Sequence, residues 1–141
     1  MKKRNNFRAA IAAFDPETLA SWGEPQVATL LQNPGIIRHR GKIEGAIRNA
    51  RAYLALENRE SFSDYLWEFL DHSPRQDRFS QGQIPTECAT SQAMAKALKQ
   101  ASFTFCGPTI TYAFMEAVGM VNDHLITCPS HVAVAALATR L

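Results

Sequence analysis

The sequence predicts an all-α protein. Apolar residues recur at intervals of three and four along the whole chain, as they do on the buried face of a helix. No alternating run of apolar and polar residues is long enough to indicate a strand. At 141 residues, 46% of them hydrophobic and 20% charged, the chain has the size and composition of one globular domain. We therefore expect a single helical domain over residues 1–141.

The first helices are expected to be short. The opening segment is helix-like from Lys2 onwards, but no polar cap precedes it, so the pattern begins inside a helix. Asp15, Pro16 and Glu17 supply a cap, a first-turn proline and an early acid, which together mark the start of a helix. That helix is expected to end near Gly23.

Two further helices have clear apolar faces. One opens at Pro25 and stops at the Asn-Pro-Gly sequence of residues 33–35. Its predicted buried residues are Val27, Leu30 and Leu31. The other runs from Lys42 to about Glu57, where apolar residues fall at spacings of four, three and four. Its predicted buried residues are Ile43, Ile47, Ala50 and Leu54.

The second half is expected to contain a central helix, a long loop and a capped helix. Ser61 opens a helix that extends to Leu70 and has little polar surface. Residues 72–86 are rich in proline and polar residues and form the longest predicted loop. Ser91 is expected to cap a helix that ends at Lys99. Its predicted buried residues are Met94 and Leu98.

Residues 91–119 predict a helix-hairpin-helix. Gly107 permits backbone torsions that other residues avoid, Pro108 has no N–H to leave unpaired in the first turn, and Thr109 offers a hydroxyl. The free N–H groups of such a turn, together with the helix dipole, bind a phosphate oxygen without reading sequence. Gly107 and Thr109 are therefore candidate DNA-binding residues. The alternative interpretation is a plain corner between two helices, and the pattern alone favours it.

Basic residues gather around the start of the helix at residues 42–57. They are Arg38, His39, Arg40, Lys42, Arg48 and Arg51. The net charge is only +2, so an argument for nucleic acid has to rest on such a cluster. Neutralising phosphates would supply salt-sensitive affinity for a duplex, and Arg38, Arg40 and Lys42 are the candidate contacts. The alternative is a solvated charged face, which is equally compatible with the pattern.

His124 and Cys128 stand four residues apart, which is close enough for both to bind one metal ion. Structural zinc sites normally have four ligands, and the further candidates nearby are His131 and Asp123. The alternative is a capping histidine beside a buried cysteine, and spacing alone favours that alternative.

The cysteines and the N-terminus bear on the compartment. Cys88, Cys106 and Cys128 are an odd number without a C-x-x-C spacing, which is typical of reduced thiols in a cytoplasmic protein. The N-terminal segment has neither the apolar region of a secretion signal nor the length of a membrane span. We expect a cytoplasmic protein that makes no contact with a membrane.

Three long motifs occur in an order that resembles one known family. They are NPGIIRHRGKIEGAIRNARAYLALE, FSDYLWEFLDHSP and FTFCGPTITYAFMEAVGMVNDH. The chain is similar to the DNA-3-methyladenine glycosylase I family, of the helix-hairpin-helix glycosylase superfamily, from Lys2 to about Cys128. The resemblance implies a helical base-excision repair enzyme that flips alkylated adenine out of DNA and hydrolyses its N-glycosidic bond. Its partner would be double-stranded DNA that contains alkylated purines.

The resemblance also implies differences at the site. The family's N-terminal portion, which has the other zinc ligands, the base-contacting acid and most stacking aromatics, has no counterpart here. His124 and Cys128 match the C-terminal zinc ligands, so the implied cofactor is zinc at a half-site. In related glycosylases an aspartate follows the second hairpin helix, and Asn122 stands at that position here. No catalytic residue is assigned.

Three hypotheses follow for function. The first is a 3-methyladenine glycosylase lacking its N-terminal portion, with impaired activity in this chain. The second is a non-catalytic DNA-binding remnant. The third is one fragment of a split glycosylase, whose uncovered apolar face would drive association with a partner segment or another copy.

Overall fold

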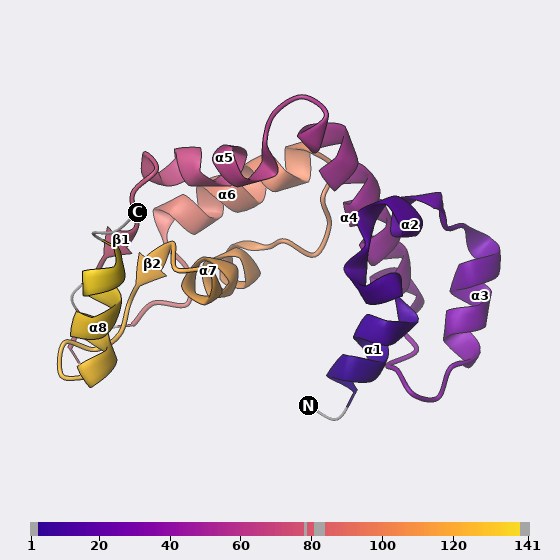
Figure 1. Cartoon of the computed structure of the whole chain (residues 1–141), viewed down its shortest axis with the longest axis horizontal. Coiled ribbons are helices and arrows are strands. Elements are labelled where there is room, and N and C mark those ends of the chain that lie inside the picture. Colours follow the sequence, from indigo (N-terminus) through magenta and orange to yellow (C-terminus); the bar gives the residue numbers. More distant parts are fainter. Residues whose placement is uncertain (1–2, 78, 81–83, 139–141) are drawn as a thin grey trace. The chain divides into compact units, whose positions relative to one another are not determined.

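The computed structural model describes residues 3–77, 79–80 and 84–138 and is mostly helical (Figure 1). The prediction of an all-α protein is confirmed. The α-helices are α1 (Arg4–Ala10), α2 (Pro16–Ser21), α3 (Glu24–Gln32), α4 (Arg40–Glu57), α5 (Phe62–Trp67), α6 (Ala89–Gln100), α7 (Pro108–Ala117) and α8 (Pro129–Ala138). Two 3₁₀ turns, η1 (Ala12–Phe14) and η2 (Glu68–Leu70), follow α1 and α5. In the described part of the chain, no helix has both the length and the apolar character needed to cross a bilayer.

The chain divides into two compact units. The first comprises residues 1–60 and 99–105, and the second comprises residues 61–98 and 106–141. Helices α1 to α4 belong to the first unit, whereas α5, most of α6, α7 and α8 belong to the second. The expectation of a single domain stays a prediction.

The core of the first unit is one apolar cluster formed by α2, α3, α4 and the segments that join them. Its fully buried members are Ile11, Leu19, Val27, Leu30, Ile36, Ile43, Ile47 and Ala50. Local start signals work as expected, since Asp15 Oδ2 accepts a hydrogen bond from the N–H of Thr18 at 2.8 Å and α2 begins at Pro16. Leu54, which was expected on the buried face, is only partly buried, whereas Leu56 is 4% exposed.

The second unit contains a small parallel sheet that the sequence did not predict. Strand β1 (Arg75–Gln76) pairs with β2 (Val121–Asn122), with Arg75 opposite Val121 and Gln76 opposite Asn122. Two-residue strands are too short to show an alternating pattern, and β1 lies within the expected loop of residues 72–86. Residues 78 and 81–83 of that loop lie outside the described residues. Buried side chains of this unit include Leu66, Leu70, Met94, Leu98, Met115 and Met120.

The start of α6 differs from the expectation. Ser91 is completely buried inside the helix, and the helix begins two residues earlier, at Ala89. Cys88 precedes the helix and exchanges bonds with Ser91: the Cys88 N–H donates to Ser91 Oγ at 2.9 Å, and the Ser91 N–H donates to Cys88 Sγ at 3.4 Å. This is the reciprocal arrangement of a capping box, with cysteine in place of the usual capping serine. A cysteine is a weak acceptor, which is why the sequence pointed to the serine instead.

The helix at residues 62–70 is less central than expected. Only Leu66 and Leu70 are buried, while Tyr65 and Phe69 are partly exposed and pack edge to face at 5.9 Å between ring centroids. An almost wholly apolar sequence therefore does not place this helix in the interior, because its aromatic residues cover one another near the surface.

Candidate nucleic-acid interface

Helix α7 begins with an open, uncapped turn. Gly107 is the N-cap residue, Pro108 has no N–H, and the N–H of Thr111 donates to the Gly107 carbonyl at 2.8 Å. Within the described residues, no acceptor is recorded for the N–H groups of Thr109 and Ile110. Both residues are exposed. Two donors at a helix N-terminus are thus available to an oxyanion.

The predicted reason for Gly107 is wrong in one respect. Its φ of −71° is open to every residue, so no special torsion is needed there. The left-handed torsions of this connection occur instead at Ser102 (φ 72°) and Phe105 (φ 59°). What Gly107 does provide is space, since a Cβ at this position would have no atom within 4 Å. A bulky group can approach the backbone closely there.

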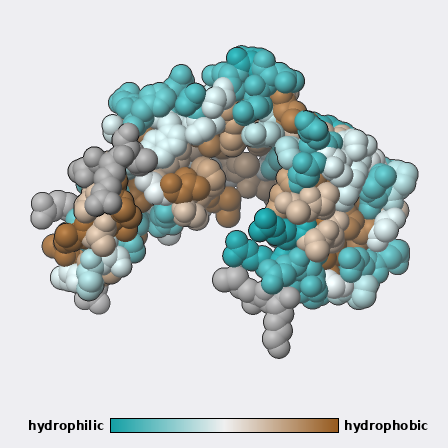
Figure 2. Space-filling model, viewed as in Figure 1, coloured by the Kyte–Doolittle hydropathy of each residue, from teal (hydrophilic) through white to brown (hydrophobic). Residues whose placement is uncertain are grey.

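One face of α7 is apolar and exposed. Ile110, Phe114 and Val118 are 62%, 40% and 48% exposed, and they follow one another at spacings of four. Figure 2 shows hydrophobic side chains at the surface over α7 and over α8. Tyr112 lies on the other side of the helix and is 2% exposed. Tyr112 is therefore a core residue.

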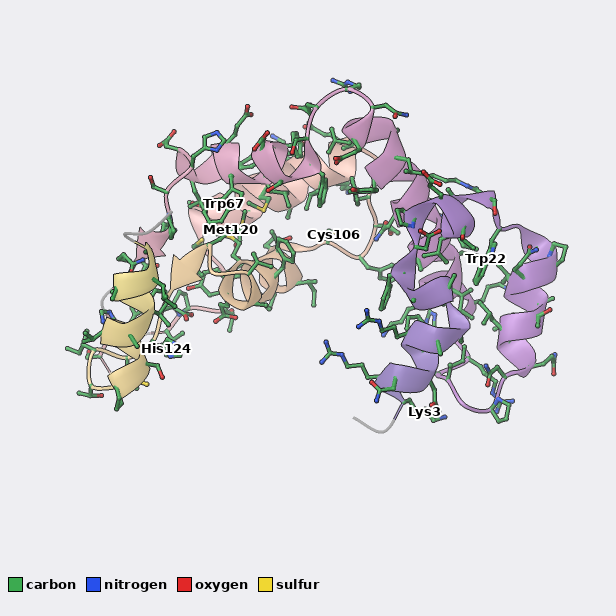
Figure 3. All side chains as sticks on the ribbon, viewed as in Figure 1. Lys3, Trp22, Trp67, Cys106, Met120 and His124 are labelled. Carbon is green, nitrogen blue, oxygen red and sulfur yellow. The ribbon has the colours of Figure 1, made fainter. Side chains whose placement is uncertain are left out.

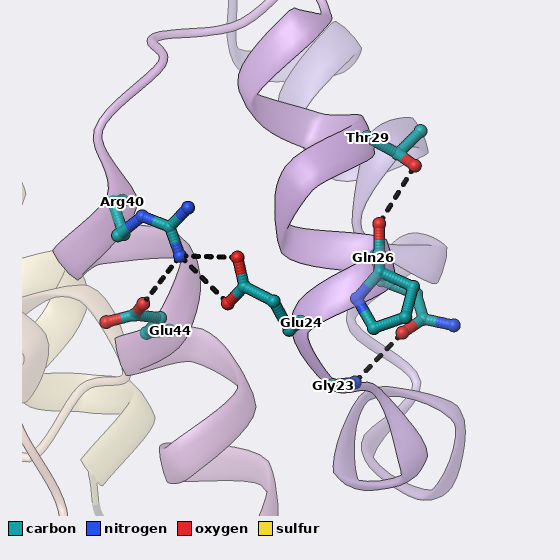
Figure 4. A network of polar contacts seen from close by, with 7 residues as sticks. Gly23, Glu24, Gln26, Thr29, Arg40 and Glu44 are labelled. Atoms are coloured by element: carbon teal, nitrogen blue, oxygen red, sulfur yellow. Dashed lines mark hydrogen bonds and ion pairs between the residues drawn. The ribbon is translucent and has the colours of Figure 1, made fainter.

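The basic residues near the start of α4 differ in whether they form ion pairs with acidic side chains. Arg40 Nη1 lies 2.9 Å from both carboxylate oxygens of Glu24 and 3.3 Å from Glu44 Oε1 (Figure 4). These hydrogen bonds, with the two negative charges, raise the pKa of the guanidinium. Arg38 and Lys42 are exposed, and no ion pair is recorded for them among the described residues.

Arg51 has a structural role instead. Its guanidinium donates to the carbonyl oxygens of Ala20 and Trp22 at 2.9 and 2.6 Å. These carbonyls lie at the C-terminal end of α2, where helix carbonyls lack partners within their own helix. Arg51 thereby joins α4 to α2.

His124 and Cys128 lie close together, but they do not form a complete metal site. Cys128 Sγ is 3.9 Å from His124 Nδ1. Zinc bonds of about 2.0 Å to nitrogen and 2.3 Å to sulfur would hold such a pair about 3.5 Å apart, so the pair itself suits the ion. Among the described residues, however, no group of three or more histidine, cysteine or acidic side chains is placed to hold a metal. Figure 3 shows His124 beside α8.

The candidate further ligands have other partners. His131 Nε2 lies 3.1 Å from the Asp77 carbonyl oxygen, and Asp123 Oδ2 accepts a hydrogen bond from the Tyr112 hydroxyl at 3.3 Å. The donor set among the described residues therefore does not fit a four-ligand zinc site.

Asn122, which the family resemblance sets at the position of an aspartate, has a structural role. It is 2% exposed, and its Nδ2 donates to Gln76 Oε1 at 2.9 Å and to the His131 carbonyl at 3.0 Å. These bonds hold β2 to β1 and to α8. Its Oδ1 is buried and has no hydrogen-bond partner within the described part of the chain.

A pair of carboxyl groups beside β2 was not found by sequence reasoning. A hydrogen bond with Asp123, partial burial and the Asp123 charge raise the pKa of Glu116 to about 7. Burial and the neighbouring Asp123 also raise the pKa of Tyr112. Glu116 lies in the last turn of α7 and Asp123 follows β2, so only the folded chain brings them together.

Comparison with known proteins identifies the family. Residues 1–131 match the model of the methyladenine glycosylase family. The chain belongs to that family. It is 48% identical over 130 residues to DNA-3-methyladenine glycosylase 1 of Escherichia coli, an alignment that covers 91% of this chain and 70% of the relative. It is 44% identical over 131 residues to the DNA-3-methyladenine glycosylase of Haemophilus influenzae, covering 92% and 71%.

Solved structures of methyladenine glycosylases have the same fold as this chain. A crystal structure of 3-methyladenine DNA glycosylase I superposes with a TM-score of 0.87 at 52% identity, covering 92% of this chain and 72% of the other. The Staphylococcus aureus enzyme, solved for its recognition of 3-methyladenine, superposes with a TM-score of 0.86 at 32% identity, covering 92% and 70%. The family match ends at residue 131, so most of α8 lies beyond it.

Proposed function

We propose that this member of the methyladenine glycosylase family acts in base-excision repair, hydrolysing the N-glycosidic bond of 3-methyladenine in alkylated DNA. The observation that supports this most is the family match over residues 1–131, with 48% identity to the E. coli glycosylase. A purine methylated at N3 is cationic, so it leaves the sugar as a neutral base and needs little chemical activation. Extruding the nucleotide from the duplex and holding it is the larger part of the work.

We assign residues of this chain to the DNA backbone. The free N–H groups of Thr109 and Ile110, at an exposed N-terminus with open space around Gly107, would bind one phosphate in a helix-hairpin-helix. In the other unit, Arg38 and Lys42 would neutralise phosphates. Arg40 would contribute only after leaving Glu24 and Glu44. Cys88, Cys106 and Cys128 form no disulfide among the described residues, which favours a cytoplasmic location.

A non-catalytic DNA-binding protein is the second candidate, and Asn122 favours it. An amide that is buried and committed to structural hydrogen bonds supplies no carboxylate to stabilise a sugar cation. If this second candidate is right, base release by these 141 residues alone lies near background. Neither function is assigned to the His124–Cys128 pair, for which no further ligand is placed among the described residues.

Two assays on the purified chain distinguish these functions. The first measures release of free 3-methyladenine from a dimethyl-sulfate-treated duplex. The second measures affinity for a labelled duplex from low to moderate salt, where phosphate contacts predict a steep fall. Release above the buffer control supports the glycosylase, and salt-dependent binding without release supports the DNA-binding protein. If the chain shows no base release and no duplex binding, both proposed functions are wrong.

Gly107→Ala tests the phosphate contact directly. Because its φ of −71° and the open space around it accommodate a methyl group, the variant should fold as well as the native chain. The methyl group would obstruct a phosphate at the turn, so we expect duplex affinity to fall by at least several-fold. Gly23→Ala is the matched control, because Gly23 is also an exposed N-cap glycine close to a proline. Equal affinities of the two variants would contradict the assignment of the α7 turn.

A further inference from the structure

A second candidate binding site lies within the first unit. A cavity of about 330 Å³ is lined by Lys3, Arg4, Phe7, Ile37 and Lys42. Lys3 and Arg4 come from the start of α1, Lys42 comes from the first turn of α4, and Ile37 precedes α4. Figure 3 labels Lys3 at this end of α1. The volume lies at the lower end of the range of small-molecule pockets, which suits a ligand the size of a mononucleotide.

The wall of the cavity is almost entirely apolar, and its three basic residues line it mainly with their aliphatic stems, which carry the positive charges at their ends. Phe7 packs against the apolar core of the unit and lies 6.3 Å from Phe14 between ring centroids, which holds its ring in place. Ile37 is 65% exposed, although Ile36 beside it is 1% exposed. Three of the five lining residues are cationic, and none is acidic. An isoleucine so exposed beside an aromatic ring is a surface that a flat apolar group would cover favourably.

Within the described part of the chain, no acidic side chain is recorded in an ion pair with the charges at this cavity. Lys3 Nζ donates to the carbonyl oxygens of Pro34 and Ile36, each at 3.2 Å, which positions the ammonium and leaves its charge uncompensated. No carboxylate is recorded in an ion pair with Arg4 or Lys42 among the described residues. The acid nearest to Lys42 in sequence on α4, Glu44, is held by Arg40 at 3.3 Å.

We propose that this cavity binds a nucleotide, with its phosphate between Arg4, Lys42 and Lys3 and its base against Phe7 and Ile37. A phosphate monoester carries close to two negative charges at neutral pH and three strong acceptor oxygens, which match several cationic donors. Base stacking on an aromatic side chain next to basic residues is how proteins hold unpaired nucleotides without reading sequence. The ligand is either a free mononucleotide or an unpaired nucleotide of a DNA strand.

This site goes beyond the phosphate contact proposed at α7. It shares Lys42 with the proposed duplex contacts, but it requires neither glycosylase activity nor the Gly107 turn. Its failure and that of the proposed function are therefore separable. A chain that binds nucleotide but not duplex DNA would reject the proposed function and leave the nucleotide site standing.

The test is a titration of the full chain with each of three ligands: dAMP, deoxyadenosine and inorganic phosphate. Binding is measured by calorimetry and by changes in amide chemical shifts. We expect dAMP to bind at least five-fold more tightly than either part alone, and to shift the resonances of Phe7 and Ile37. Arg4→Gln and Lys42→Gln should each weaken dAMP binding several-fold, and Ile37→Ser should weaken it about two-fold. Arg8→Gln is the matched control, because Arg8 is an exposed arginine of the same helix outside the cavity. Gly107→Ala should leave dAMP binding unchanged.

The same titration identifies the source of the ligand and can overturn the proposal. A pentathymidylate without terminal phosphates that binds more tightly than dTMP, and loses affinity in Arg4→Gln, indicates a DNA strand. Binding of the mononucleotide alone indicates a free nucleotide. If phosphate or deoxyadenosine binds as tightly as dAMP, or if Arg8→Gln weakens binding as much as Arg4→Gln, the two-part site is wrong. Absence of any binding rejects it as well. Circular dichroism of each variant confirms that these exposed substitutions leave the fold intact.

Discussion

Asn49 and Thr104 exchange two hydrogen bonds. Asn49 Nδ2 donates to the Thr104 carbonyl at 3.0 Å, and the Thr104 N–H donates to Asn49 Oδ1 at 2.8 Å. Thr104 belongs to the segment of residues 99–105, which lies in the same unit as α4. One amide side chain on α4 therefore satisfies both backbone groups of a residue 55 positions later in the chain. This bond pair fixes the segment that leads into Gly107 and α7.

Asn49→Ala is expected to destabilise the protein. The substitution removes both hydrogen bonds to the backbone of the partly buried Thr104, and the loss is expected to cost about 1–3 kcal/mol. Chemical denaturation in urea would measure this loss. Asn5→Ala, at an exposed position inside α1, is the control and should change stability by less than about 0.5 kcal/mol. Equal midpoints for the two variants would show that the bond pair adds nothing.

Gly45→Ala is expected to destabilise the protein although alanine favours helices. A Cβ at Gly45 would lie 2.7 and 2.8 Å from Phe105 ring atoms and 3.2 Å from Thr104 Cγ2. The gain of about 1 kcal/mol in helix propensity should be outweighed by displacement of the segment, for a net loss of about 1 kcal/mol. Gly41→Ala, whose nearest atom would be at 3.3 Å on the His39 ring, is the control. A higher melting temperature for Gly45→Ala than for the native chain would refute the expectation.

Glu24→Gln is expected to strengthen duplex binding. The substitution removes the carboxylate whose two oxygens hold Arg40 Nη1 and leaves Glu44 as the acid recorded against it, and an exposed ion pair of this kind is weak. Affinity should rise about two- to five-fold, with a steeper salt dependence, if Arg40 then reaches a phosphate. Glu17→Gln removes the same charge from an exposed position on α2 and serves as the comparison. If the two variants gain the same duplex affinity, the gain comes from the change in net charge alone and not from Arg40.

Glu116 should make stability depend on pH. Its pKa is raised to about 7 in the folded chain by the hydrogen bond with Asp123, so the folded state retains a proton that the unfolded state has lost. Stability should therefore fall as pH rises from about 4.5 towards about 7 and level off above it. Melting temperatures of Glu116→Gln should lack this component. The same pH profile for the native and variant chains would exclude Glu116 as its source.

Metal removal should have little effect on this chain. Because the His124–Cys128 pair has no third or fourth ligand among the described residues, a chelator such as EDTA should shift the melting temperature by less than about 1 °C. Added zinc should likewise bind weakly and be lost on gel filtration. Cys128→Ser provides the reference state without the pair. A large stabilisation by zinc in the native chain but not in Cys128→Ser would show that further ligands exist.

The sequence by itself determined the helical class, the family and most helix positions. Asp15 before Pro16, and the spacing of Ile43, Ile47 and Ala50, depend on torsions and faces within a few residues, so they are legible in one segment. The candidate contacts at residues 38–42 and at Gly107 were likewise visible as local composition.

Only the tertiary structure decided which of those groups are free to act. Glu24 neutralises Arg40 from another helix, Asn122 is committed to Gln76 and His131, and the Glu116–Asp123 pair forms across a turn. The short strands β1 and β2 also find each other across 46 residues. Each of these relationships joins residues that belong to different segments, from seven to 46 positions apart in the sequence. Local periodicity carries no information on the distances in space between such residues, because they are set when apolar faces pack together.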